Sequence, residues 1–318
     1  MHKIFITGGC GFIGSHLTEF IYSKYKKSQI FVYDKITYAA SVKNLDKIRK
    51  DRRVKIIKND LNNYKSLKKF TKNTDILIHA AAESHVDNSF NLTNEFIKTN
   101  VLGTKNVLDA CKANNIKKII HISTDEIYGE IHKSSFNEQS NFNPSNPYSS
   151  SKAAAEMIIN GYIHSYKLPI IIIRANNIFG TRQHPEKLLP GSCWSLLKKK
   201  HFTLHGNGMQ KRSFLYVEDF CKAIYLILQK GKLNEIYNIG SKFEYKNIDV
   251  FKIAAKENKL NFRKYVKYVK DRPFNDYRYS LNFNKIKKIG WKPTTKIEDK
   301  IYEINSWYKK NKNRFKKR

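Results

Sequence analysis

The sequence has few cysteines and no long apolar run. Only 4 of its 318 residues are cysteine, and none forms a Cys-x-x-Cys pair or lies in a cluster with histidine. This spacing argues against a zinc site, so we expect no metal, and against a disulfide framework. Free cysteines are typical of a reducing compartment, which predicts a cytoplasmic protein. No apolar run approaches the ~20 residues of a membrane helix, and the first residues enter a strand pattern directly, so we expect neither a membrane segment nor a signal peptide.

Acidic residues are also scarce. Lys and Arg number 60 against 27 Asp and Glu, which gives a formal net charge of +33. A basic surface attracts polyanions, so nucleic acid and anionic lipid must be considered. The lysines are nevertheless spread along the whole chain, and only Lys198–Lys200 and the C-terminal tail form runs. We find no zinc finger, basic zipper or RNA-binding aromatic signature. A lysine-rich solvated surface without a specific nucleic-acid partner is the expectation, and a basic binding or scaffold protein remains the rival.

Short apolar strands alternate with helical patterns in the first half of the chain. Near-continuous apolar strands of this kind predict a parallel sheet that is covered by helices on both faces. The sequence therefore predicts an α/β fold of the Rossmann type, a doubly wound parallel sheet followed by a smaller C-terminal α/β lobe. The expected strands are Lys3–Thr7, Gln29–Asp34, Val54–Asp60, Thr74–Ala81, Lys117–Thr124 and Leu168–Gly180, and a helix is expected over Asn94–Ala113.

A glycine-rich turn joins the first strand to the first helix. Gly8, Gly11 and Gly14 fall in "ITGGCGFIGSHL", where the backbone must come close to a pyrophosphate at the helix N-terminus. Asp34 ends the second strand about 20 residues later, as the dinucleotide-binding fingerprint requires. An acid at this position accepts hydrogen bonds from the ribose hydroxyls and repels a 2′-phosphate, so the prediction is NAD. Asp60 could reach the adenine, or it is only an acid at a strand end.

A tyrosine and a lysine follow four residues apart. Tyr148 and Lys152 come at the start of a predicted helix after Pro147, and residues four apart share one helical face. A neighbouring ammonium stabilises phenolate, so we expect it to lower the pKa of the tyrosine and let it act as a base. Together with the glycine-rich turn and Thr124 at a strand end, this pair resembles the catalytic set of the extended short-chain dehydrogenase/reductase superfamily.

An acid pair narrows this resemblance. In "STDEIYG", Asp125 and Glu126 come directly after Thr124, and the stretch resembles the signature of the nucleotide-sugar 4,6-dehydratases. Further stretches that are similar to this family run through nearly the whole chain: "AAAESHVDNS", "HPEKLLP", "KRSFLYVED", "YNIGS" and "DRPFNDYRY". Epimerases and decarboxylases of the same fold need only the Thr, Tyr and Lys, and they would leave the acid pair unexplained.

The resemblance implies a three-stage reaction on a nucleoside-diphosphate hexose. Tyr148 takes the C4 hydroxyl proton while Thr124 holds that oxygen and hydride passes to NAD. Glu126 then removes the C5 proton, and Asp125 protonates the departing C6 hydroxyl. Hydride finally returns to C6 and a proton to C5, which gives a 4-keto-6-deoxy sugar. NAD is regenerated, so the enzyme is a lyase. Two neighbouring carboxylates with separated pKa values suit this division of roles.

The resemblance also assigns the remaining site residues and the partners. It implies an NAD-binding domain over residues 1–178 and a nucleotide-sugar-binding lobe over 179–318, with an approximate boundary and segments that can interleave. It further implies a homodimer built from the helices at 94–113 and 148–166. The expected cofactor-binding residues are Gly8, Gly11, Phe12, Ile13, Gly14, Asp34, Asp60, Leu61, Ala80, Ala82, Asn100, Tyr148 and Lys152. The expected substrate-binding residues are Ser84, Thr124, Asn177, Glu186, Lys187, Arg212 and Arg272.

Three departures from the family pattern bear on specificity. Phe179 and Thr181 stand where Tyr and Pro are common, and "GSCWSLL" follows Pro190. We expect these positions near the sugar and nucleotide pocket. The substrate is expected to be dTDP-glucose, with UDP-glucose a close second because "FNDYRY" is similar to UDP-glucose-using relatives.

Overall fold

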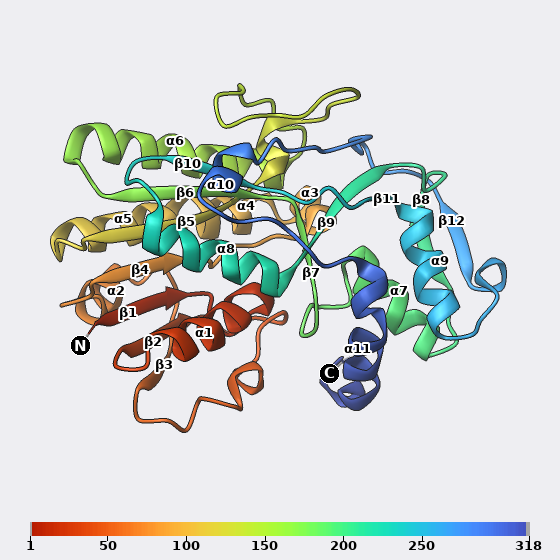
Figure 1. The fold of residues 1–318 in the computed structure, drawn as a ribbon, viewed down its shortest axis with the longest axis horizontal. Helices are drawn as coiled ribbons and strands as arrows, with labels where there is room; N and C mark the ends of the chain where they lie inside the picture. The colour runs from red at the N-terminus through yellow and green to blue at the C-terminus, as the bar shows by residue number, and fades with distance from the viewer. Residues whose placement is uncertain (1, 316–318) are drawn as a thin grey trace.

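Seven parallel strands form the main sheet of the computed structural model, which describes residues 2–315 (Figure 1). The last three residues of the basic C-terminal run lie outside this range. The strand order is β10-β6-β5-β4-β1-β2-β3, and every neighbouring pair is parallel. The strands are β1 Lys3–Thr7, β2 Gln29–Asp34, β3 Val54–Lys58, β4 Ile76–His79, β5 Lys118–Thr124, β6 Ile170–Ala175 and β10 Ile236–Ile239.

Alternate residues of each strand enter two separate cores, one on each face of the sheet. On β1, Ile4 and Ile6 pack with Leu17 in one core, whereas Phe5 packs with Val107 in the other. Because both faces are apolar, helices must cover both, which confirms the predicted doubly wound fold. The first core receives α1 Phe12–Lys24 and α8 Val217–Lys230, and the second receives α2 Tyr64–Phe70, α5 Gly103–Ala113 and α6 Pro147–Tyr166 (Figure 1).

The helix expected over Asn94–Ala113 is present as one helical run with a change of winding. It begins as α4 Thr93–Phe96, continues as a π-helical segment over Ile97–Leu102 and ends as α5. The short helix α3 Val86–Asn91 precedes it and starts beside the carboxyl end of the sheet.

The smaller lobe contains two short sheets and three packed helices, at the right of Figure 1. Helices α7, α9 and α11 contact one another, and the antiparallel pair β11·β9 extends through β9 to parallel β7. The lobe comprises β7 Asn177–Phe179, α7 Leu188–Leu197, β8 Phe202–His205, β9 Lys211–Tyr216, β11 Glu244–Lys246, α9 Asn247–Glu257, β12 Val266–Val269 and α11 Ile297–Lys310. Short 3₁₀ turns occur at Val42–Leu45, Asp125–Tyr128, Phe262–Lys264 and Lys312–Phe315, and α10 Asn284–Lys288 lies against β10.

The single strand expected over Leu168–Gly180 is wrong, because the chain breaks at Asn176. Strand β6 pairs with β5 in the large sheet, whereas β7 pairs with β9 in the small one. The Asn176 side chain bonds sideways at this point, to Asp125 and to the backbone of Ser241. An apolar run cannot reveal such a break, since both halves are buried.

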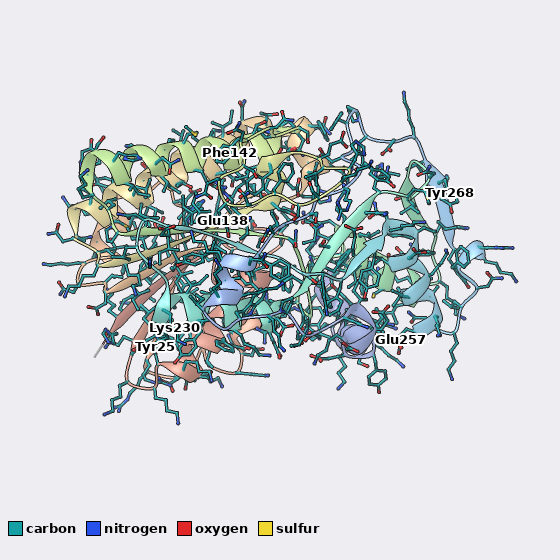
Figure 2. All side chains as sticks on the ribbon, turned by 45° about the horizontal axis from the view of Figure 1, so that its top comes forward. Tyr25, Glu138, Phe142, Lys230, Glu257 and Tyr268 are labelled. Carbon is teal, nitrogen blue, oxygen red and sulfur yellow. The ribbon has the colours of Figure 1, made fainter. Side chains whose placement is uncertain are left out.

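The two lobes interleave along the chain. Helix α8, strand β10 and helix α10 come from residues after 179, yet they pack on or join the large sheet. Figure 2 shows Tyr25 and Lys230 close together at the end of this unit, with Glu257 and Tyr268 in the smaller lobe. The predicted division at residue 178 stays a prediction. No helix within residues 2–315 has both the length and the apolar character needed to cross a membrane.

Candidate active site

The glycine-rich turn is packed so tightly that side chains are excluded. A Cβ on Gly14 would lie 2.1 Å from the carbonyl oxygen of Gly8, and one on Gly8 would lie 2.6 Å from the Cα of Ala81. Gly8 also has φ +69, a left-handed conformation that favours glycine. Gly11 caps α1 without a side-chain hydrogen bond to the helix N-terminus. The first backbone N–H groups of α1, which begins at Phe12, have no partner within the helix, so this helix start suits an anion such as a pyrophosphate.

Asp34 lies at the carboxyl end of β2, beside this turn. Its carboxylate accepts hydrogen bonds from the backbone N–H groups of Cys10 (2.9 Å) and Ile36 (2.7 Å). Burial raises the pKa of Asp34, and the backbone donors act in the opposite direction. Asp60 pairs with Lys35 at 2.8 Å; the pKa of Asp60 is lowered, since its hydrogen bonds and Lys35 outweigh partial burial. Both acids line one large cavity.

The cavity lies between the carboxyl ends of the parallel strands and the smaller lobe, and its volume is about 630 Å³. Ligands of open α/β sheets bind in this crevice. Every expected site residue lines it except Asn100 and Asp125. Its lining includes Gly8, Gly11, Phe12, Ile13, Gly14, Asp34, Asp60, Leu61, Ala80, Ala82, Ser84, Thr124, Glu126, Tyr148, Lys152, Asn177, Glu186, Lys187, Arg212 and Arg272.

Asn100 acts behind the cavity wall. Its amide oxygen accepts from the backbone N–H of Glu83 at 2.9 Å, and its amide nitrogen donates to the Glu83 carbonyl (3.0 Å) and the Ser151 hydroxyl (2.9 Å). Both amide protons are thereby used. Asn100 ties the loop after β4 to α6, and its expected contact with the cofactor stays a prediction.

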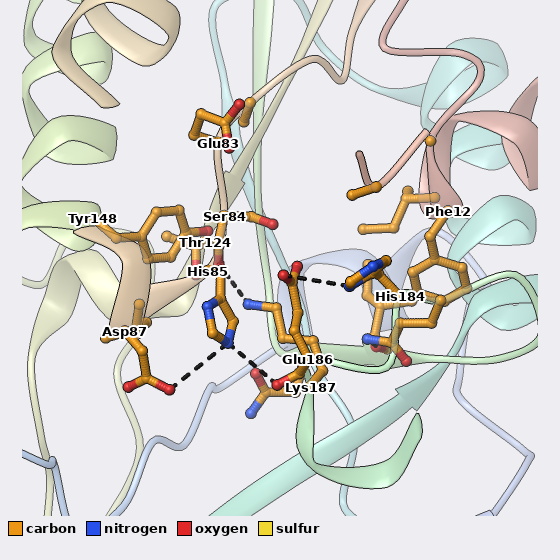
Figure 3. A pocket seen from close by; sticks show the side chains of 18 of the residues that line it. Phe12, Glu83, Ser84, His85, Asp87, Thr124, Tyr148, His184, Glu186 and Lys187 are labelled. Atoms are coloured by element: carbon orange, nitrogen blue, oxygen red, sulfur yellow. Dashed lines mark hydrogen bonds and ion pairs between the residues drawn. The ribbon is translucent and has the colours of Figure 1, made fainter. Parts of the chain in front are cut away.

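Thr124, Tyr148 and Lys152 face one region of the cavity. Thr124 ends β5, and Tyr148 and Lys152 lie on the first turns of α6, where Pro147 and the Asn146 cap start the helix. Figure 3 shows the Tyr148 ring next to the Thr124 side chain. Lys152 is 3% exposed and donates to the carbonyl of Ile122 at 2.8 Å. Burial lowers the pKa of Lys152 to about 8.

The sequence predicted a lowered pKa for Tyr148, but the groups of the protein itself raise this pKa. Burial and then the charge of Glu126 raise the pKa of Tyr148 above its ordinary value, and the Thr124 hydroxyl opposes them only in part. The Lys152 ammonium is directed to the Ile122 carbonyl, so it does not offset the loss of hydration. The i,i+4 spacing predicted a shared face but could not predict this competing acceptor.

Asp125 and Glu126 occupy different environments although they are adjacent. A 3₁₀ turn starts at Asp125, capped by Thr124, whose hydroxyl accepts from the Glu126 N–H at 3.3 Å. The Asp125 carboxylate is 3% exposed and accepts from Asn176 at 2.6 Å. Burial, followed by the charge of Glu126, raises the pKa of Asp125 to about 7. Burial also raises the pKa of Glu126, while Lys187 and Arg212 oppose it. Asp125 thus has a pKa near neutral pH and lies behind the cavity wall, whereas Glu126 faces two cations in the cavity.

Three of the expected substrate residues, Lys187, Arg212 and Arg272, form a cationic side of the cavity. The Arg212 guanidinium lies over the Tyr279 ring, 4.5 Å from its centroid. Arg272 pairs with Asp87 at 2.6 Å. Lys187 donates to the carbonyl of Ser84 at 2.5 Å, a contact drawn in Figure 3. Arginines suit a diphosphate because their forked donors match its oxygens.

The loop before α7 is held by a further set of polar contacts (Figure 3). His184 Nδ1 lies 3.4 Å from the Glu186 carboxylate. The pKa of Glu186 is lowered, since the contact with His184 and neighbouring cations outweighs its burial. His85 lies between Asp87 (3.7 Å) and the carbonyl of Glu186 (3.2 Å).

Sequence reasoning missed several residues of the site. Asn176 positions Asp125, although only its neighbour Asn177 was singled out from "RANNIF". Asp276 and Tyr279 of "DRPFNDYRY" line the cavity, whereas the sequence indicated only Arg272 in this segment. Of the departures, Gly191 lines the cavity as expected, whereas Phe179 and Thr181 do not. Phe179 packs instead between Phe214 and Tyr216, because β7 turns it away from the crevice.

Comparison with known proteins assigns the family. The family model described as GDP-mannose 4,6 dehydratase matches residues 5–304. The chain belongs to this family. It is 39% identical to a dTDP-D-glucose 4,6-dehydratase of Dictyostelium discoideum, with 98% of this chain and 83% of that protein covered. It is also 40% identical to a trifunctional protein of Arabidopsis thaliana that includes UDP-glucose 4,6-dehydratase in its name, over 97% of this chain and 47% of that protein.

A solved structure agrees with this assignment. The dTDP-glucose 4,6-dehydratase DesIV of Streptomyces venezuelae, with NAD and TYD bound, superposes with a TM-score of 0.95 at 34% identity. The superposition covers 98% of each chain. The resemblance to nucleotide-sugar 4,6-dehydratases that the sequence motifs indicated is therefore confirmed along the whole chain, and the Rossmann-type fold with it.

Proposed function

We propose that this protein is an NAD-dependent NDP-glucose 4,6-dehydratase, a hydro-lyase that converts dTDP-glucose to dTDP-4-keto-6-deoxyglucose and water. The observation that carries the proposal is the pair Asp125 and Glu126 beside Thr124 and Tyr148, in a family of 4,6-dehydratases. An epimerase would have no use for two carboxyls with different surroundings at this point.

The cavity fits NAD on its own geometry. The close-packed glycine turn would let the pyrophosphate approach the first N–H groups of α1, and Asp34, beside the turn, would accept hydrogen bonds from ribose hydroxyls. NAD, when bound, accepts the hydride from C4 and later supplies it to C6. Tyr148 and Lys152 line the same cavity and would hold the cofactor together with the glycine turn and Asp34; a cation bound there would favour the Tyr148 phenolate, which the protein groups alone disfavour.

The protein residues divide the proton transfers. Tyr148 removes the C4 hydroxyl proton and Thr124 hydrogen-bonds the same oxygen. Glu126, facing the cavity and two cations, removes the proton at C5 and returns a proton to C5 once hydride has reached C6. Asp125, whose pKa is about 7, holds the proton that the C6 hydroxyl takes as water leaves. Asp125 is not part of the cavity lining, so this role requires the Asp125 carboxyl to turn toward the substrate.

The cationic side of the cavity would take the diphosphate. Arg212 and Arg272 contribute from the smaller lobe, and Lys187 reaches from the loop before α7. Arg272 would have to exchange Asp87 for phosphate oxygens. Ser84, Asn177 and Glu186 lie at the cavity wall, where they suit hydroxyls of the hexose.

UDP-glucose is the second candidate substrate, because the Arabidopsis relative carries that sugar nucleotide in its name. The deciding experiment incubates the purified protein with dTDP-glucose and UDP-glucose separately, without added reductant. We expect a product one water lighter by mass that develops the ultraviolet absorbance of 4-keto-6-deoxy sugars in alkali. A product of unchanged mass would indicate an epimerase, and no product from either substrate would contradict the proposal.

A homodimer in the cytoplasm completes the proposal. Large apolar side chains are exposed on the π-helical segment and α6, namely Ile97 (44%), Leu102 (50%), Met157 (60%) and Tyr166 (50%). Isolated exposed apolar residues are ordinary, but a set on neighbouring helices suits a partner. A specific nucleic-acid partner is not part of the proposal, and binding of random DNA at physiological salt would contradict that expectation.

A further inference from the structure

The 3₁₀ turn Lys312–Phe315 lies beside α7 and α11, far along the chain from the residues of the cavity. Lys312 and Asn313 are exposed, whereas Arg314 and Phe315 are partly buried. These two side chains contact two different loops, and each loop leads to one half of the cavity. The sequence offered no functional signal at this turn.

Phe315 packs against the loop that carries the substrate residues. Its ring centroid lies 5.5 Å from that of Trp194 and 5.7 Å from that of His184, in edge-to-face geometry. His184 in turn contacts Glu186 at 3.4 Å. On the same side, the Tyr308 hydroxyl donates to the carbonyl of Gln183 at 2.5 Å. Gln183 and His184 line the cavity, whereas Trp194, Tyr308 and Phe315 do not. These aromatic side chains therefore support the loop from outside the cavity.

Arg314 reaches the cofactor side. Its guanidinium donates to the Asn44 amide oxygen at 2.6 Å. The Asn44 amide nitrogen donates to the carbonyl of Cys10 at 2.9 Å, and Cys10 lies between two residues of the glycine-rich turn, Gly9 and Gly11. Asn44 is 4% exposed, so the bond from Asn44 to Cys10 is shielded from water, and the charge-assisted bond from Arg314 is partly buried.

We propose that Arg314 and Phe315 are positioning residues that set the two halves of the active site from outside it. Arg314 fixes the glycine-rich turn through Asn44, and Phe315 fixes Glu186 and Lys187 through His184. The role of Phe315 rests on the proposed function, because it concerns the sugar-nucleotide site; the role of Arg314 concerns only the NAD site. A site held on loops needs such support, since a displacement of about 1 Å at a binding group costs much of its effect.

Two substitutions separate the two arms. Arg314→Ala is expected to weaken NAD binding by about fivefold or more, with little change in dTDP binding. Phe315→Ala is expected to weaken dTDP binding and raise the KM for the sugar nucleotide by a similar factor, about fivefold, with NAD binding unchanged. Calorimetric titration with NAD and with dTDP measures both, and neither titration requires turnover. The conservative variants Arg314→Lys and Phe315→Tyr should bind both ligands within about twofold of the unaltered protein.

Lys312→Ala and Asn313→Ala are the matched controls, since both residues lie in the same turn and are exposed. Both should bind NAD and dTDP as the unaltered protein does. The inference is overturned if Arg314→Ala and Phe315→Ala bind like these controls. It is also overturned if both lose both ligands alike, because that pattern indicates general loosening of the structure. A lack of dehydration by the unaltered protein would remove the proposed function, while the two titrations would still decide the role of the turn.

Discussion

Asp125 and Glu126 are neighbours in the chain, yet their side chains meet different physical conditions. Asp125 is enclosed and bonded to a neutral amide, whereas Glu126 faces the cations Lys187 and Arg212. Enclosure favours the protonated carboxyl, and nearby cations favour the carboxylate. These two environments therefore support the proposed roles, with Asp125 as the acid and Glu126 as the base.

Glu126→Gln should stop water loss without stopping the first oxidation. An amide cannot accept the C5 proton, but Tyr148 and Thr124 remain in place. Bound NAD should be reduced on addition of dTDP-glucose, and kcat for the dehydrated product should fall by about 100-fold or more. Absorbance of reduced NAD and product mass measure the two steps. Glu303→Gln, on the outer surface of α11, is the control and should turn over normally. Full turnover by Glu126→Gln would show that Glu126 is not the base.

Tyr148→Phe should block the reaction one step earlier. The ring would keep its packing against Phe96, 6.2 Å away between centroids, but no phenol would be left to take the C4 proton. We expect neither reduced NAD nor product, with NAD binding retained. Reduction of NAD at the unaltered rate would show that another group serves as the base.

The pH dependence should reflect both acids. Dehydration needs a protonated Asp125, so kcat/KM should fall as the pH rises through about 7. It also needs ionised Glu126, whose raised pKa places the acidic limb above the range of an ordinary glutamate. The amide of Asn176 stabilises ionised Asp125, and its loss raises that pKa. Asn176→Ala should therefore move the alkaline limb to higher pH. If the limb did not move, Asp125 would not be the group that titrates on the alkaline side.

At the scale of elements, the joint between β1 and α1 is the most constrained. A Cβ at Gly14 would lie 2.1 Å from a backbone oxygen, and backbone cannot yield as a side chain can. Gly14→Ala should lower the free energy of unfolding by about 2 kcal/mol or more and abolish NAD binding. Thermal unfolding and NAD titration measure the two effects.

Gly161→Ala provides the matched control within another helix. Gly161 lies inside α6, is exposed, and has no atom within 4 Å of the added Cβ. Because Gly161 lies one turn from Met157, on the proposed dimer surface, the control is read by NAD titration, and NAD binding should be unchanged. If Gly14→Ala behaved in the same way, the close approach of the turn to α1 would not be the reason for its glycine.

The whole molecule offers one apolar surface that suits a second copy. Leu102→Glu would place a charge among the exposed apolar side chains of the π-helical segment and α6, and burial of an unpaired charge is costly. We expect a shift from dimer to monomer in sedimentation experiments. Tyr302→Glu, at a side chain on α11 that is 73% exposed, should leave the dimer intact. A monomeric unaltered protein would contradict the proposed dimer itself.

The sequence by itself determined the features that depend on neighbours along the chain. Apolar strands alternating with helices specify a parallel sheet, and the glycines before α1 specify a close turn, because both requirements are local. The adjacency of Thr124, Asp125 and Glu126 and the helical spacing of Tyr148 and Lys152 are likewise local. These patterns were sufficient for the fold, the family and a set of residues of which all but Asn100 and Asp125 line the cavity.

Only the tertiary structure decided how distant groups compete. It broke the expected strand at Asn176 and directed that amide to Asp125. It directed Lys152 to the Ile122 carbonyl and enclosed Tyr148, which reversed the expected direction of the tyrosine pKa. It also brought Arg314 beside the glycine-rich turn. Burial and hydrogen-bond competition depend on atoms from many parts of the chain, so no local pattern of residues could have determined them.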